Sequence, residues 1–299
     1  MRITNNIIRE NALTNMRRGL QQMEAAQQQV GTGKKVLRAS DDPGASATIL
    51  RTRGSLRALE QYRSAIETAN LRAGMEESAL DELSELLDRA KELGVSQGTA
   101  TADATTREHT RAEVEGLLRH AVLLANTEFD GNYLFGGSTS DVRPYDLDET
   151  GPSLDFTSSN PGGDHQVEIS ARQLVRTNHN GAEIFGTAAS GPIAAVRDLA
   201  RALQTNDVDA IYDALDSIDV AADSVQTLVA DTGARLNHLQ ITSGNLDALE
   251  ANLVTFKSDL EEVDMEKAIT ELVGRQSAFQ AAMIATSRVM SLNLADYLR

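Results

Sequence analysis

Apolar residues recur at steps of three and four positions through residues 239–290. Such steps place side chains on one narrow stripe of an α-helix. A stripe this narrow is typical of a helix that packs against a partner helix in a coiled coil. The large apolar residues on this stripe are Leu239, Leu246, Leu249, Leu253, Phe256, Leu260, Val263, Ile269, Leu272, Phe279, Met283 and Met290.

Residues 13–30 show the same spacing, with Ile3 and Ile7 ahead of them. We therefore expect an N-terminal helix that is the counterpart of the closing one. Residues 232–237 are expected to connect the closing helix to the helix before it. The remaining stretches with helical periodicity are 40–96, 107–127, 193–203 and 208–230.

The run Ser40–Gly44 combines serine, two aspartates, proline and glycine. Ser and Asp side chains accept the free N–H groups at a helix start, and Pro is tolerated in the first helical turn. A catalytic pair of aspartates is the alternative, but no His or metal-ligand cluster lies beside them in the sequence. The pattern therefore predicts the start of a long helix.

The middle of the chain has a different character. Four of the five prolines and six of the eleven Phe and Tyr residues fall between Phe129 and Pro192. Apolar–polar alternation predicts strands there, with turns at 160–163 and 178–181. The expected strands are 132–135, 153–156, 166–169 and 173–176.

The predicted fold is mainly α: a long antiparallel helical rod or coiled-coil bundle built from both termini, with a small inserted β-rich domain. We expect an N-terminal assembly segment at 1–38 and a C-terminal one at 264–299. The two halves of the helical rod are expected at 39–129 and 192–263, on either side of the β-rich domain at 130–191.

The charge of the chain is uneven. Its formal net charge is −16, yet residues 1–38 carry seven Lys or Arg against two Glu, a net +5, which leaves −21 for the remainder. An acidic body argues against nucleic acid as a partner, because phosphate neutralisation needs a basic face. With no apolar signal core and no eighteen-residue apolar run, we expect neither a cleaved signal peptide nor membrane insertion.

Candidate chemistry is sparse. The chain has no cysteine, and its five histidines lack metal-ligand spacing. Asp146, Asp148 and Gly151 match part of a calcium loop, but Thr150 and Thr157 replace essential ligands. We predict no catalytic, cofactor or metal site, so the protein is not expected to be an enzyme. An enzyme housed in the β insert and a cytoplasmic coiled-coil scaffold are the alternatives from other classes.

The two end segments are the candidate assembly interface. Gly31 and Gly33 interrupt the pattern on one side, and residues 264–267 do so on the other. We expect the end segments to lack a partner in a single chain and to pair only on assembly, because exposed apolar stripes mark interaction surfaces. The interface residues are Ile3, Ile7, Leu13, Met16, Leu20, Met23, Ile269, Leu272, Phe279, Met283 and Met290.

Several segments resemble the flagellin superfamily in its order. Residues 31–44 resemble its glycine-then-Asp-Asp-Pro signature, and residues 90–99 resemble the end of its first long helix. The segments 232–239, 264–280 and 294–298 resemble its C-terminal half. In the middle region, 129–137, Pro144-Tyr145 and 180–185 resemble the hook-associated branch more than filament flagellin.

The resemblance implies a non-enzymatic structural adapter at the junction of hook and filament, outside the cell, with filament flagellin as the alternative. It implies export through the flagellar type III channel without a cleaved signal peptide, after a cytoplasmic chaperone has covered the C-terminal helix. The implied partners are other copies in a ring, the other hook-associated junction protein and flagellin. No cofactor is implied.

Overall fold

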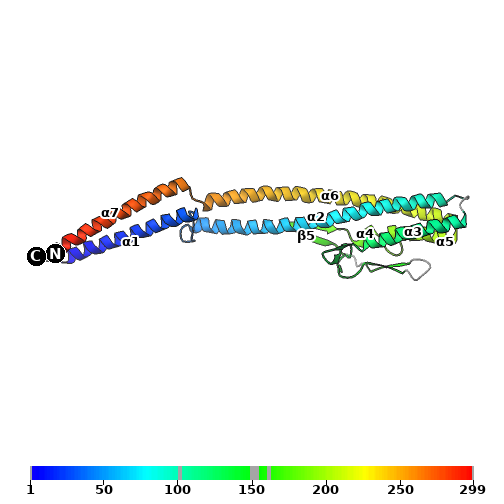
Figure 1. Ribbon diagram of the computed structural model, residues 1–299, viewed down its shortest axis with the longest axis horizontal. Coiled ribbons are helices and arrows are strands. Elements are labelled where there is room, and N and C mark those ends of the chain that lie inside the picture. The colour runs from blue at the N-terminus through cyan, green and yellow to red at the C-terminus, as the bar shows by residue number, and fades with distance from the viewer. Residues whose placement is uncertain (1, 100–102, 149–154, 160–162, 298–299) are drawn as a thin grey trace. The chain divides into compact units, whose positions relative to one another are not determined.

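The computed structural model describes residues 2–99, 103–148, 155–159 and 163–297. Within these ranges the chain is mainly helical, with short strands confined to its middle, and this confirms the expected fold class (Figure 1). The helices are α1 (Arg2–Thr32), α2 (Pro43–Gln97), α3 (Ala104–Ala125), α4 (Gly181–Ile184), α5 (Pro192–Thr205), α6 (Val208–Glu261) and α7 (Met265–Tyr297).

Two compact units divide the chain. The first contains residues 1–58 and 249–299, and the second contains residues 59–248. The first unit therefore joins the two ends of the sequence, and the second contains the whole middle of it. The five-part division expected from the sequence stays a prediction.

In the second unit, α2 and α6 are antiparallel. Arg63 pairs with Asp247, Glu76 with Arg235 at 3.0 Å, and Lys91 with Asp219 at 2.6 Å. Residue numbers rise along α2 as they fall along α6, so one register holds over this length. Toward one end α3 and α5 pack against each other, and a single hydrophobic core joins residues of all four helices.

The start of α2 follows the predicted capping chemistry. Asp42 Oδ1 accepts the Ala45 N–H at 2.9 Å, while Asp41 Oδ2 accepts the N–H groups of Leu37 and Arg38 at 3.1 and 2.8 Å. The Asp42 carboxylate satisfies a backbone donor that would otherwise be free at the helix start, whereas Asp41 binds the connector that precedes α2. The aspartate pair therefore has a structural role.

The expected connection at 232–237 is wrong, because α6 continues through it without interruption. Glycine in a helix interior costs about 1 kcal/mol relative to alanine, which is why Gly233 suggested a break. Tertiary contacts outweigh that cost, since Thr232 and Arg235 on either side of it are both buried and hydrogen-bonded to α2.

The inserted region consists of three separate antiparallel hairpins in the described ranges. The predicted strands 166–169 and 173–176 are confirmed, whereas 132–135 is strand only at its first two residues. The first two residues of the predicted strand 153–156 and most of the turn at 160–163 lie outside the described residues. The hairpins are β1 (Glu128–Phe129) with β2 (Asn132–Tyr133), β3 (Tyr145–Leu147) with β4 (Phe156–Ser158), and β5 (His165–Ser170) with β6 (Gln173–Asn178).

The sequence missed β1, β3 and α4. The turn expected at 178–181 leads directly into α4, because the Asn180 side chain accepts the Glu183 N–H at 3.1 Å and caps that short helix. The missed strands are two or three residues long, too short for a period of two to be visible.

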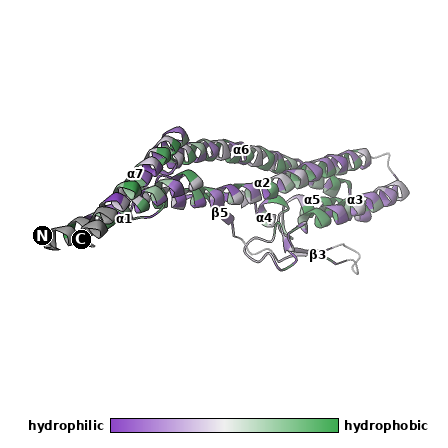
Figure 2. Cartoon of the chain, turned by 60° about the vertical axis from the view of Figure 1, so that its left-hand side comes forward, coloured by the Kyte–Doolittle hydropathy of each residue, from purple (hydrophilic) through white to green (hydrophobic). Residues whose placement is uncertain are grey.

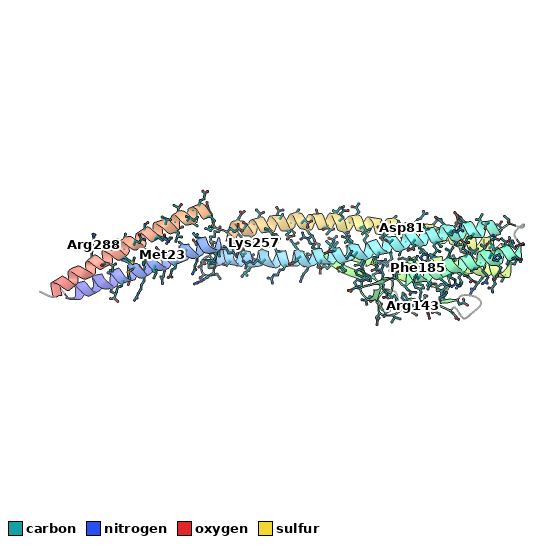
Figure 3. All side chains as sticks on the ribbon, in the orientation of Figure 1. Met23, Asp81, Arg143, Phe185, Lys257 and Arg288 are labelled. Carbon is teal, nitrogen blue, oxygen red and sulfur yellow. The ribbon has the colours of Figure 1, made fainter. Side chains whose placement is uncertain are left out.

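A cluster of aromatic side chains fills the core of the inserted region. Phe185, which is labelled in Figure 3, is its central residue. The rings of Phe135 and Phe185 meet edge to face at 5.1 Å, and the ring of Tyr145 lies 5.9 Å from Phe185. All three are completely buried, and the Tyr145 hydroxyl donates to the Gly186 carbonyl at 2.7 Å. Gly186 has φ +81°, and a Cβ there would lie 2.2 Å from the Ser190 carbonyl oxygen, so only glycine fits.

Replacing the central ring tests this packing. We expect Phe185→Ala to lower the free energy of unfolding by about 3–5 kcal/mol, because it leaves a cavity in a fully buried cluster. Leu174→Ala, at a side chain that is 62% exposed, is the control and is expected to change little. Urea unfolding followed by circular dichroism measures both, and equal losses for the two variants would contradict the assignment.

Candidate assembly surface

In the first unit, α1 and α7 lie side by side as an antiparallel pair (Figure 1). Polar and apolar residues alternate along both helices, as expected where each helix buries one face only (Figure 2). The side chains turned toward the partner helix are buried or half-buried. They are Leu13, Met16, Gly19, Met23, Ala26 and Val30 on α1, and Ala268, Leu272, Arg275, Phe279, Ala282 and Thr286 on α7.

Small residues let these two helices approach closely. A Cβ built on Gly19 would lie 3.4 Å from the Phe279 ring, so the ring rests directly on the α1 backbone. Ala26 and Ala268 are the most buried side chains of the pair, each 5% exposed. Five of the predicted interface residues (Leu13, Met16, Met23, Leu272 and Phe279) therefore belong to this intramolecular seam.

The other predicted residues have a different position. Ile7, Leu20, Ile269 and Met283 stay between 38% and 51% exposed. At the last two positions the seam uses the small residue just before, Ala268 or Ala282. The side chains of Ile3 and Met290 lie outside the described residues. On α7 the exposed apolar side chains, which we call the outer row, are Met265, Ile269, Val273, Met283 and Ile284, each between 42% and 57% exposed.

The expectation that the end segments lack a partner in a single chain is wrong for this structure. Both segments are helical and each is the partner of the other. The reason is that their seams follow the same spacing and can interlock in antiparallel orientation. Among the described side chains of the two helices, those of the outer row stay exposed in one chain, as do Ile7 and Leu20.

The segment that follows α1 is hydrogen-bonded to the segment between α6 and α7. The Lys35 N–H donates to the Glu261 carbonyl at 2.8 Å, and the Val263 N–H donates to the Gly33 carbonyl at 2.9 Å. These bonds form a single β-bridge between Lys34 and Glu262. Gly33 has φ +69°, a left-handed conformation that glycine adopts without strain.

Glu261 adds an ionic contact to this bridge. Its buried carboxylate accepts from Lys34 Nζ at 2.5 Å and from Arg53 Nη2 at 2.7 Å. The hydrogen bond from Lys34 lowers the pKa of Glu261 and outweighs the opposing effect of burial, with Arg53 adding to the lowering. We call Lys34, Arg53 and Glu261 the Glu261 cluster. The sequence did not predict this cluster, because Arg53 and Glu261 are 208 residues apart and only the two helix breaks mark its position.

Neither a group of metal ligands nor a membrane-spanning helix is found in the part of the chain that the structure describes. Within those residues, no three His, Asp or Glu side chains converge as metal ligands. None of the helices there combines the length and the apolar character needed to cross a membrane.

Two segments of the chain match known protein regions. Residues 3–140 match the bacterial flagellin N-terminal helical region, and residues 215–298 match the bacterial flagellin C-terminal helical region. Together these matches cover most of α1 to α3 and most of α6 and α7.

Individual relatives include both filament and hook-associated proteins. The chain is 30% identical to a flagellin of Bacillus subtilis, with all of both chains covered. It is 27% identical to flagellar hook-associated protein 3 of Escherichia coli, over 89% of this chain and 90% of that protein. The crystal structure of flagellar hook-associated protein 3 from Legionella pneumophila has the same fold: the TM-score is 0.63 at 14% identity, over 71% of this chain and 98% of that one.

Glu261→Gln tests the Glu261 cluster. Its partners are almost half exposed, so we expect a loss of about 1–2 kcal/mol, between the values for surface and buried ion pairs. Amide hydrogen exchange should show weaker protection across α1 and α7. Glu262→Gln, at the exposed neighbour, is the control, and equal protection in both variants would contradict the assignment.

The stabilisation contributed by Glu261 is expected to depend on pH. Because the pKa of Glu261 lies below its ordinary value of 4.5 in the folded chain, its stabilisation is present above pH 4.5 and is lost as the pH falls through the lowered value. The protection of wild type and Glu261→Gln should therefore converge in acid, as hydrogen exchange corrected for intrinsic rates would measure. A difference that grew on acidification would contradict this.

Proposed function

Since this chain belongs to the bacterial flagellin family, whose members are axial components of the extracellular flagellum, we propose that it is the adapter joining hook-associated proteins to the filament. In this role it is a hook-associated protein 3 (FlgL). As a flagellar axial protein, the chain is structural and not an enzyme. The proposal concerns its place along the flagellum.

The middle region carries the proposal. The segments that resemble the hook-associated branch are 129–137, Pro144-Tyr145 and 180–185, and filament flagellins vary most in this region. In the folded chain these segments supply Phe135, Tyr145 and Phe185, which pack into one buried cluster. The resemblance therefore rests on residues that specify the structure of the insert and not on surface loops. The hook-associated protein 3 of Legionella pneumophila, which shares the fold of this chain, is consistent with the proposal.

Assembly through the terminal helices follows from the outer row. The outer row places five exposed apolar side chains on one face of α7, and each large apolar side chain that becomes fully buried contributes about 1.5–3 kcal/mol. We propose that the outer row, with Ile7 and Leu20 of α1, packs on neighbouring copies in a ring. The other junction protein and flagellin would meet the same terminal helices at the two ends of the ring. Before export, a cytoplasmic chaperone would cover α7.

Filament flagellin is the second candidate. The specific observation in its favour is the Bacillus subtilis flagellin, which is 30% identical over the whole of both chains. A filament protein would use the same terminal helices, so the two candidates differ in place and copy number and not in fold.

Deletion of the gene distinguishes the two candidates. If the protein is the junction adapter, the mutant keeps its hook and sheds unpolymerised flagellin into the medium, because filament subunits have no junction on which to polymerise. If it is a filament subunit, the mutant lacks that subunit and sheds none. Immunoblots of the medium with electron microscopy of the cells measure both, and the second outcome would overturn the proposal.

Val273→Glu tests the outer row. We expect it to abolish complementation of the deletion strain, since a charge on this surface cannot be buried between subunits without a partner. Ala278→Glu adds the same charge to the same helix at an exposed position away from the outer row and should complement. Circular dichroism of the purified variants should show unchanged helix content. Complementation by Val273→Glu would exclude the outer row as an interface.

A further inference from the structure

A buried group of charged and polar side chains lies at one point of the second unit. Glu76 of α2 is completely buried, and three hydrogen-bond donors and one imidazole nitrogen converge on its carboxylate. The His179 N–H and the Thr232 hydroxyl each donate to Oε1 at 3.2 Å, and Arg235 Nη1 donates to Oε2 at 3.0 Å. The His179 Nδ1 also pairs with Oε1. We call Glu76, His179, Thr232 and Arg235 the Glu76 cluster.

This cluster connects three parts of the fold. Glu76 belongs to α2, Thr232 and Arg235 to α6, and His179 follows directly after β6. Arg235 also donates to the Thr177 carbonyl of β6 at 3.3 Å. One carboxylate therefore holds the end of the β5–β6 hairpin against both long helices.

The other attachments of the hairpin are also mostly polar: the Asn178 side chain of β6 donates to the Leu134 carbonyl at 2.7 Å, and Arg176 pairs with Glu183 of α4. Among the described residues, none of those in β5 or β6 belongs to the hydrophobic core that joins α2, α3, α5 and α6. Ile169 is its one completely buried aliphatic side chain, and Gln173 forms a hydrogen bond of 3.2 Å with His238 of α6. Its attachment thus depends on polar and ionisable groups, whereas the helices are held by apolar packing.

The surrounding charges make the attachment sensitive to acid. Burial alone would raise the pKa of Glu76, but the His179 hydrogen bond and the Arg235 charge together bring it below its ordinary value of 4.5. Asp231 of α6 faces the same group, at 3.0 Å from Arg235 Nη2 and 3.2 Å from His179 Nε2. The charge of Arg176 of β6 helps to lower the pKa of Asp231. Burial, followed by the charge of Arg72 one turn before Glu76, lowers the pKa of His165.

We propose that the Glu76 cluster is an acid-released fastening of the β5–β6 hairpin: protonation of Glu76 detaches the hairpin while α2 and α6 stay paired. A protonated carboxyl accepts fewer hydrogen bonds and leaves the buried guanidinium of Arg235 with the largely exposed carboxylate of Asp231 as its remaining ion-pair partner, which is unfavourable. The contribution of Glu76 is present above pH 4.5 and is lost as the pH falls through its lowered pKa. Because a flagellar axial protein lies outside the cell, the pH of the medium controls this state.

Glu76→Gln removes the charge at neutral pH and tests the proposal directly. In the full chain at pH 7, we expect amide protection across 165–178 to fall at least about 100-fold, as for a broken buried ion pair. Protection of the central turns of α2 and α6 should stay within a few-fold of wild type. Glu67→Gln, at an exposed position of α2, is the matched control and should leave both regions unchanged. Equal losses in hairpin and helices, or no loss in the hairpin, would overturn the proposal.

A distance measurement tests the pH dependence. The chain has no cysteine, so Leu174→Cys and Ile241→Cys, both at exposed positions, can carry two spin labels on the hairpin and on α6. The distance between the labels should lengthen as the pH falls below 4.5, while circular dichroism shows that helix content is kept. With Glu76→Gln added, the distance should already be long at pH 7. A distance that stays short in acid, or that lengthens only with loss of helix, would overturn the proposal.

Discussion

Every long helix of this protein depends on an antiparallel partner from the opposite end of the sequence. A narrow apolar stripe cannot be covered by its own helix, so a helix with such a stripe is stable only against another one. Here α1 pairs with α7 in one unit, and α2 pairs with α6 in the other. The two halves of the chain are thus interdependent in both units.

Repeated apolar stripes leave the register of a helix pair weakly specified, because a shift by one repeat produces similar apolar contacts. Buried carboxylates remove this ambiguity. Glu261 finds its cations only where the breaks near Gly33 and Val263 lie opposite each other. Glu76 finds Arg235 and His179 only in the observed register of α2 and α6. Each ion cluster contributes modest stability and strong discrimination against shifted pairings.

The division between apolar and polar attachment also separates what is permanent from what can change. Helices α2, α3, α5 and α6 and the aromatic cluster around Phe185 are held by buried apolar surface, which does not depend on pH. The end of the β5–β6 hairpin is instead held by polar contacts that include the buried carboxylate of Glu76. The outer row of α7 is apolar surface without a partner in one chain, which connects the fold of the monomer to a role in assembly.

The sequence alone indicated the long helices, the start of α2 at Asp42 and the β5–β6 hairpin, because these depend on local periodicity and capping. The family resemblance came from local motifs as well. Tertiary structure decided the seam of the terminal helices. Apolar periodicity marked the largest side chains, such as Ile269, whereas close approach of two backbones required small ones, such as Gly19.

Tertiary structure also decided the ion clusters and the continuity of α6 through Gly233. Glu76 and His179 are 103 residues apart, and Arg53 and Glu261 are 208 apart, so no local pattern links either pair. A helix period is visible in a dozen residues, since it arises from neighbours along the chain. A buried charge is stabilised only by whatever folding brings to it from a distance, and that cannot be determined from its neighbours in the sequence.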